Sequence, residues 1–191
     1  PAMIATARKK DSRLPLAVSD LCALPFRQSM DLITCLFDSL NFIVNDDDLA
    51  KAFGELYGSL APGGILYTDV ITERMVTEHF EGQEWEEDNE GFSSRWSSRF
   101  DRAQGIAESR VRVNTGSVSV ICERIYTREQ VEALLRNAGF DLLGVYDAES
   151  WKAPGKKTTR IDFVAVKEGS PQLKKRFEGV ADEIRGLVYA Q

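Results

Sequence analysis

The sequence is poor in the residues that build metal sites, disulfide frameworks and membrane spans. Its 191 residues include one histidine and three cysteines, at positions 22, 35 and 122, with no paired spacing. A structural zinc site needs several such ligands at short spacings, so we expect no metal. No apolar run approaches membrane-span length, and no signal peptide is visible. Unpaired cysteines without a secretion signal indicate a reduced, cytoplasmic protein.

A basic charge excess is also missing. The formal net charge of -6 argues against electrostatic binding of the whole molecule to nucleic acid. The basic runs at 156–157 and 174–176 are interpreted as solvated faces. With 43% hydrophobic residues, the chain is long enough for one domain with a real core, or one domain with an insert. Neither nucleic acid nor a membrane is an expected partner.

Helical and strand patterns alternate along most of the chain. Helices are expected at residues 3–10, after a cap at Asn45 or Asp46, and after the capping box that starts at Thr127. Strands are expected at residues 16–19, 31–36, 65–71, 140–146 and 161–166. The strand at 31–36 is apolar on both faces, as a parallel sheet requires.

A second pattern interrupts this alternation. Residues 73–90 are polar and acidic, and period-two alternation follows at 92–101, 106–114 and 117–126. Alternation of this kind is typical of half-exposed antiparallel strands. The sequence therefore predicts an α/β sheet with a small antiparallel appendage.

The loop after the strand at 31–36 carries more apolar surface than loops usually do. It contains Phe37, Leu40, Phe42 and Ile43. Ligands of open α/β sheets bind at the carboxyl ends of the strands, so this loop is one candidate wall of a ligand cleft. Asp20, after the preceding short strand, is a candidate acceptor for an adenine amino group. The alternative is that Asp20 only caps its own turn and that Leu40, Phe42 and Ile43 belong to the core.

Five segments in this order resemble a known family. They are "AVSDLCALPF", "MDLITCLFDSLNFI", "LAPGGILYTDV", "RIYTREQVEALLRNAGFDLLGVYD" and "RIDFVAVK". Their order and spacing are similar to those of class I S-adenosylmethionine-dependent methyltransferases. The likeness is greatest to the small-molecule branch that carries a β insert after the fifth strand, and it covers roughly residues 3–167. It implies a Rossmann-like sheet, S-adenosylmethionine as cofactor and a small-molecule substrate.

The resemblance also implies roles for individual residues on the cofactor side. Asp20 would accept the adenine amino group, and the backbone of Leu21 would meet the adenine ring. Leu36 and Phe37 would lie along the methionine and ribose part. Asp38 follows in the same loop and is assigned to the cofactor side with them.

The substrate side follows from the same comparison of positions. The family places the methyl acceptor between the end of the fifth strand, here Asp69 to Thr72, and the insert. Trp85, Trp96 and Arg99 are the insert residues expected there. Each tryptophan has packing between strands as its alternative role.

A general base would help only if the acceptor is a hydroxyl or an ammonium group. Asp69 and His79 are the candidates, with Tyr67 as a competitor better explained by packing. The alternative for His79 is a surface position on a polar helix. The acidic run at 84–90 either attracts a cationic amine or is a solvated loop.

The sequence lacks one part of the family pattern, and this predicts an incomplete cofactor-binding domain. No glycine-x-glycine precedes Asp20, so the strand and glycine-rich loop that wrap the methionine part of the cofactor have no counterpart. By analogy with the family order 3-2-1-4-5-7-6, strands 1 and 2 are missing. We expect an N-terminally truncated domain whose binding of cofactor alone is weak or absent, with an unpaired edge at the strand 31–36. Either the chain is a fragment, or a second chain fills the gap, or strands 3 and 4 pair. Pro1 and Ala2 are a candidate cloning remnant before a start at Met3.

The end of the chain has no counterpart in the family. Residues 1–169 are expected to form the α/β domain, with the insert at about 80–125, and residues 170–191 an amphipathic helix. Ser170 would be its N-cap and Pro171 its first residue. Its apolar residues form a narrow seam made by Leu173, Phe177, Val180, Ile184 and Leu187. This seam packs either on its own domain or on a second chain, which makes a homodimer through the helix or the exposed sheet edge a further expectation.

Three functions are compatible with these patterns. The leading one is an S-adenosylmethionine-dependent methyltransferase acting on a small molecule, present here as an incomplete domain. The alternative from another class is a non-catalytic, methyltransferase-like interaction module. A nicotinamide-dependent oxidoreductase would need its own glycine fingerprint, which the sequence does not show.

Overall fold

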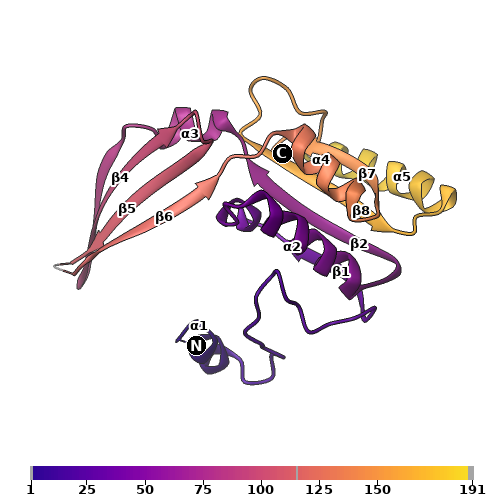
Figure 1. Cartoon of the computed structure of the whole chain (residues 1–191), viewed down its shortest axis with the longest axis horizontal. Helices are drawn as coiled ribbons and strands as arrows, with labels where there is room; N and C mark the ends of the chain where they lie inside the picture. The colour runs from indigo at the N-terminus through magenta and orange to yellow at the C-terminus, as the bar shows by residue number, and fades with distance from the viewer. Residues whose placement is uncertain (1, 115, 189–191) are drawn as a thin grey trace.

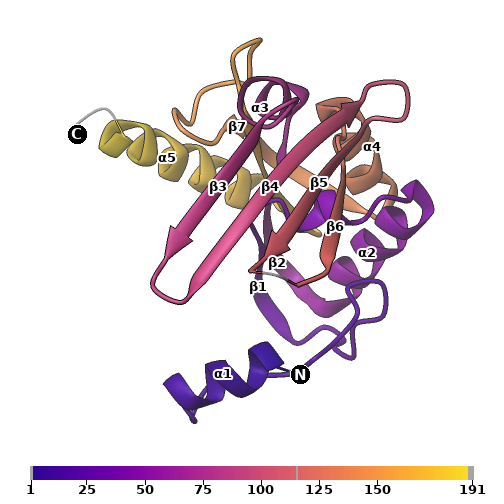
Figure 2. The same ribbon diagram turned by 90° about the vertical axis from the view of Figure 1, so that its left-hand side faces the viewer.

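The computed structural model describes residues 2–114 and 116–188 and consists of two β-sheets with helices around one of them (Figure 1). Pro1 and the last three residues of the expected C-terminal helix lie outside the described residues. Ala2, a candidate cloning remnant, begins the first helix, α1 (Ala2–Lys10), which has no buried residue. Figure 2 shows α1 apart from both sheets.

The main sheet has four strands in the order β1-β2-β8-β7. They are β1 (Met30–Cys35), β2 (Leu60–Ile71), β8 (Arg160–Lys167) and β7 (Phe140–Asp147). β1 is parallel to β2, whereas β8 is antiparallel to both of its neighbours. This order reproduces the 4-5-7-6 half of the expected sheet, and the predicted Rossmann-like α/β class is confirmed. Among the described residues, β1 has a partner on one side only, and its Leu32 is 59% exposed.

The prediction of a strand at residues 16–19 is wrong. This segment is irregular, and the nearest pairing is an isolated bridge between Asp20 and Ala23. A strand needs a neighbour for its backbone N–H and C=O groups. Since no strand lies beside this segment in the described chain, it does not form a ladder, and the expected alternative of pairing with β1 is absent as well.

Two helices cover one face of the main sheet and form the core with it. They are α2 (Asp46–Ser59) and α4 (Arg128–Asn137). Asn45 caps α2 by accepting the backbone N–H groups of Asp47 and Asp48, and both bonds of the predicted capping box are present at α4. The two helices and strands β2 and β8 share a fully buried cluster, in which α2 contributes Leu49, Phe53 and Leu56, α4 Val131 and Leu135, and the strands Leu66 and Phe163.

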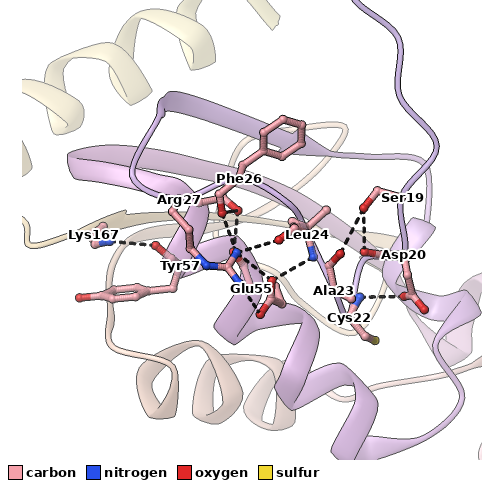
Figure 3. A network of polar contacts seen from close by, with 11 residues as sticks. Ser19, Asp20, Cys22, Ala23, Leu24, Phe26, Arg27, Glu55, Tyr57 and Lys167 are labelled. Carbon is pink, nitrogen blue, oxygen red and sulfur yellow. Dashed lines mark hydrogen bonds and ion pairs between the residues drawn. The ribbon is translucent and has the colours of Figure 1, made fainter.

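A buried lysine closes the end of α2. Lys167, the last residue of β8, is 4% exposed and donates to the carbonyl oxygen of Tyr57 at 3.0 Å (Figure 3). It also donates to the carbonyl oxygen of Leu60 at 2.9 Å. Its ammonium group also lies 4.6 Å from the centre of the Tyr57 ring. Carbonyl groups at a helix C-terminus lack partners within the helix, so this contact ties α2 to the sheet.

The second sheet is antiparallel, with the order β3-β4-β5-β6, and Figure 2 shows it in front of the main sheet. Its strands are β3 (Glu84–Asn89), β4 (Phe92–Asp101), β5 (Ile106–Val113) and β6 (Val118–Arg124). The three alternating stretches are thus confirmed, but β3 falls where a polar loop was one expectation. Although β3 is acidic, it pairs with β4. Trp85 of β3 stacks on Trp96 of β4, with 5.4 Å between the ring centres. The short helix α3 (Glu73–His79) packs Val76 against Ile71 and Ala107 where the sheets meet.

A buried asparagine joins the two sheets. Asn41 lies in the 3-10 helix η1 (Ser39–Phe42), is fully buried, and accepts the Ile71 backbone N–H at 3.1 Å. Its side-chain amide donates to the carbonyl of Arg124 at the end of β6 at 2.8 Å. The apolar loop after β1 is therefore partly core, since Leu40 is fully buried, and partly surface, since Phe37 is 82% exposed.

The C-terminal helix α5 (Pro171–Val188) packs on β7 of its own domain. Ser170 caps it as predicted, by accepting the Leu173 N–H. Ala181 is buried and the Phe177 ring lies 6.4 Å from that of Tyr146, whereas Leu187 remains 68% exposed. Only part of the predicted seam is therefore covered.

Within the two described ranges, we find no helix with the length and apolar character that crossing a membrane requires.

Replacing Asn41 by alanine should lower the free energy of unfolding by about 2–3 kcal/mol, because the Ile71 N–H and the Arg124 C=O would both lose a buried partner. Urea denaturation followed by circular dichroism measures this. The matched variant Asn137→Ala removes an exposed asparagine from the end of α4 and should change stability by less than about 0.5 kcal/mol. Equal effects of the two substitutions would show that Asn41 does not join the sheets.

Candidate functional site

The chain turns sharply just beyond the carboxyl end of β1, through two consecutive left-handed residues. Phe37 has φ 59° and Asp38 has φ 53°, a conformation that residues other than glycine rarely adopt. Each such residue costs on the order of 1–3 kcal/mol, and strain of this kind gathers at ligand sites. The Phe37 ring gains little packing in return, since it is 82% exposed.

Asp69, near the end of β2, holds this turn. Its carboxylate accepts the backbone N–H of Phe37 at 3.2 Å and that of Asp38 at 3.0 Å. Arg160, the first residue of β8, donates to the same carboxylate at 2.5 Å and to the Asp38 carboxylate at 2.9 Å. Asp69 is 4% exposed and both of its oxygens accept hydrogen bonds. It is placed to hold the backbone rather than to receive a proton from a ligand.

A second acidic residue reaches the turn from the other sheet. The carboxyl of Glu123, on β6, lies against that of Asp38, and its Oε1 atom is buried without a hydrogen-bond donor among the described residues. Burial, then the Asp38 carboxyl, raise the pKa of Glu123 to about 7, although the Arg160 charge opposes the shift. Because a carboxylate cannot donate, the contact becomes a hydrogen bond only when one carboxyl is protonated. Glu123 should therefore keep its proton up to about pH 7.

Tyr67 is bonded away from the turn. Its hydroxyl donates to Asp162 at 2.7 Å, and Asp162 is 3% exposed. Burial, and then this neighbouring carboxyl, raise the pKa of Tyr67 well above its usual range. Trp151 stacks on Tyr146 at 4.7 Å and meets Tyr67 edge-on at 6.3 Å. These contacts agree with the packing role expected for Tyr67.

The segment around Asp20 is fastened to α2 (Figure 3). The Asp20 carboxylate accepts the Cys22 N–H at 2.8 Å, so Asp20 does cap its own turn. Glu55 of α2 accepts the Leu24 N–H at 2.9 Å and pairs with Arg27 at 3.1 Å. The side chain of Asp20 is itself exposed. The turn thus has a defined shape and presents a carboxylate to solvent.

The remaining candidates make their described contacts away from the turn network. His79 is exposed at the last position of α3, as its alternative role predicted. Arg99 pairs with Glu108 on the second sheet at 2.7 Å, and Trp85 and Trp96 stack on each other. Thr72 caps α3.

Of the other predicted cofactor residues, Leu36 directly precedes the turn. Leu21 and Leu36 are half-buried, and Leu21 packs against the main core.

Two residues of the turn network were missed from the sequence. Glu123 has a detectable signal, because it is a charged residue that lies between Ile121 and Ile125 on one face of an alternating segment. Arg160 opens the segment "RIDFVAVK", and its partners lie 91 and 122 residues away in the chain. No local pattern marks such a contact. Within the described ranges, the side chains form no histidine, cysteine or carboxylate group suited to a metal ion.

Comparison with known proteins places this geometry in a family context. A family model described as "Methyltransferase domain" matches residues 1–64. The Bacillus subtilis protein named "Putative methyltransferase YqeM" is 26% identical over 149 residues, which are 74% of this chain and 60% of that protein. The chain thus spans less than two thirds of that relative's length.

Solved structures of methyltransferases share the fold of this chain. An S-adenosylmethionine-dependent methyltransferase from Clostridium acetobutylicum superposes with a TM-score of 0.75 at 24% identity, over 88% of this chain and 71% of that one. CalS10 of Micromonospora echinaspora, an amino pentose methyltransferase solved with S-adenosylmethionine bound, has a TM-score of 0.64 at 25% identity, over 87% and 70%. The predicted resemblance to class I S-adenosylmethionine-dependent methyltransferases is confirmed.

The buried proton of Glu123 should make stability depend on pH. The pKa of Glu123 is higher in the folded protein than its ordinary value of 4.5, so the folded state keeps a proton that the unfolded chain releases as pH rises from 4.5 to about 7. The wild type should therefore lose stability relative to Glu123→Gln across this window. The difference should reach on the order of 2 kcal/mol above pH 7, allowing for partial solvent access.

Urea unfolding of both proteins at pH 4.5, 6, 7 and 8.5 measures this difference. A stability gap between the wild type and Glu123→Gln that stays constant from pH 4.5 to 8.5 would contradict a proton held at Glu123.

Proposed function

We propose that this chain, with its class I methyltransferase fold, forms the adenine and acceptor side of an enzyme that transfers the methyl group of S-adenosylmethionine to a small molecule. The observation that carries the proposal is the turn at Phe37 and Asp38, which is strained, exposed and held by a buried carboxylate at the carboxyl end of β1. Ligands of open α/β sheets bind at this edge.

Each cofactor residue has a role that fits its surroundings. Asp20 uses one carboxylate oxygen for the Cys22 N–H, and the other would accept the adenine amino group. The Leu21 backbone would meet the ring. Leu36 and the exposed ring of Phe37 would line the methionine and ribose part, beside Asp38.

On the acceptor side, the substrate would lie between the end of β2, at Asp69 to Thr72, and the second sheet, with Trp85, Trp96 and Arg99 as candidate contacts. In the reaction the S–CH₃ bond breaks as the acceptor atom bonds to the methyl carbon, and an amine or hydroxyl acceptor then loses a proton. The protein contributes mainly alignment of the two reactants, worth up to about 7–11 kcal/mol in well-oriented systems. His79 is the remaining base candidate, since Asp69 is enclosed by donors.

The acceptor class that we propose is a small amine-bearing molecule. CalS10, with 25% sequence identity, is an amino pentose methyltransferase, and the carboxyl groups of Glu123 and Asp38 face each other beside the same turn. A cationic amine would be attracted to the negative charge that this pair gains above about pH 7, where Glu123 is ionised.

The proposal includes incomplete cofactor binding by these residues alone. Among the described residues, β1 has no strand on its outer side and the segment 16–19 is irregular, so no further strand completes the site on that side. The same exposed edge, together with Leu32, favours a non-catalytic interaction module as the second candidate function.

Titration of S-adenosylhomocysteine into the purified chain, followed by NMR and with the mass in solution measured alongside, tests this function. We expect weak saturable binding, with a Kd of about 0.1–1 mM. Micromolar one-to-one binding would contradict the proposed incompleteness. Absence of binding at several millimolar would contradict the enzyme and leave the interaction module.

The variant Asp20→Asn tests the adenine contact. The amide oxygen still accepts the Cys22 N–H and preserves the turn, but the amide nitrogen now opposes the adenine amino group with a second donor. The Kd for S-adenosylhomocysteine should rise by about fivefold or more. Asp88→Asn, at an exposed acidic position of β3, is the matched control and should leave the Kd unchanged. Equal Kd values for all three proteins would remove Asp20 from the cofactor site.

A further inference from the structure

We propose that Arg160 is a positioning residue for methyl-donor binding, which acts with Asp69 to keep the Phe37–Asp38 turn in its left-handed conformation. The inference rests on the proposed function, because that function makes the turn a wall of the cofactor site. Arg160 is not proposed to contact the methyl donor itself. Its effect passes through the two carboxylates that it bridges.

The turn needs an external restraint. Two adjacent residues with Cβ atoms adopt positive φ, and the larger of them, Phe37, is 82% exposed. An exposed ring cannot hold its backbone by packing. Glycine would adopt these angles freely, and the chain uses none here.

Asp69 supplies that restraint through the backbone. Its two oxygens accept two successive N–H groups, at 3.2 and 3.0 Å, which is the arrangement by which a turn binds an anion. If φ of either residue returned to the common negative region, the N–H groups would no longer converge on one carboxylate. The left-handed conformation and the Asp69 contact therefore depend on each other.

Arg160 makes the buried charge of Asp69 tolerable. Asp69 is 4% exposed, and a carboxylate at such a site is stable only when it is paired and hydrogen-bonded. The guanidinium places one nitrogen on Asp69 and the other on Asp38. A planar fork can bridge two carboxylates in this way, whereas a lysine ammonium is a point charge on a flexible stem.

The sheet places Arg160 at this point. In the antiparallel register, Arg160 lies opposite Ile71 and Asp162 lies opposite Asp69, so the guanidinium reaches the end of β2 from the neighbouring strand. Glu123 approaches Asp38 from β6. The turn is thus held from β2 and β8 and contacted from the second sheet.

The test compares Arg160→Ala and Arg160→Lys with the wild type by two measurements. The first is hydrogen exchange at the Phe37 and Asp38 amides, which needs no ligand. The second is the Kd for S-adenosylhomocysteine. In Arg160→Ala, exchange at these two amides should accelerate by about tenfold or more, and the Kd should rise about fivefold to tenfold. Arg160→Lys should fall between the alanine variant and the wild type, because it keeps the charge and loses the second donor.

Exchange at the core amides of Val131 and Leu135 separates a local effect from general destabilisation, and it should stay unchanged. Arg136→Ala, which breaks an exposed pair with Glu132 on α4, is the matched control and should alter neither readout. Where the alanine variant fails to fold, the lysine variant carries the test.

Unchanged exchange at Phe37 and Asp38 would overturn the proposal, as would accelerated exchange with an unchanged Kd. A wild type that does not bind S-adenosylhomocysteine would instead refute the proposed function. The exchange measurement would still decide whether Arg160 holds the turn, so the two failures are distinguishable.

Discussion

The structure depends on one buried carboxylate at the junction of its two sheets. Asp69 binds the turn after β1 through two backbone N–H groups and is neutralised by Arg160 from β8. Ile71 lies two positions after Asp69 in β2, and its backbone N–H donates to the Asn41 side chain. The Asn41 amide also donates to the Arg124 carbonyl at the end of β6. The end of β2 is therefore where the main sheet, the strained turn and the second sheet are joined. Isolated charges are costly in such a place, so the partners must all be present together.

This junction is the part of the molecule that we propose as one side of the reaction site. It gathers three carboxyl groups around one guanidinium, and one of the carboxyls, Glu123, has its pKa raised to about 7 by burial and by Asp38. Groups with perturbed pKa values collect at functional sites, although ion networks also produce them. The exposed Phe37 ring beside these groups is a second, independent observation.

Local patterns predicted most of the fold and the helix ends. The cap at Asn45, the capping box at Thr127 and the alternation in β4 to β6 all describe neighbours within a few residues, where propensity and side-chain bonding decide the outcome. Two predictions differ from the structure, the strand at residues 16–19 and the polar loop where β3 lies, and they failed for the same reason. Residues 16–19 have strand-like sequence but no neighbouring strand, whereas acidic β3 gains a ladder and a tryptophan stack from β4. Strand formation depends on a partner, which the segment itself does not encode.

The sequence by itself determined the α/β class, the second antiparallel sheet and the family resemblance, because these follow from periodicity, caps and the order of short motifs. It also marked the loop after β1 as unusual. Only the tertiary structure decided which groups act on that loop. Arg160 bonds Asp38, which lies 122 residues away in the chain. Asp69, a candidate base in the sequence, accepts the backbone N–H of Phe37 in the structure. Such roles depend on strand register and on the loss of water around a charge, and both arise only when distant segments pack together.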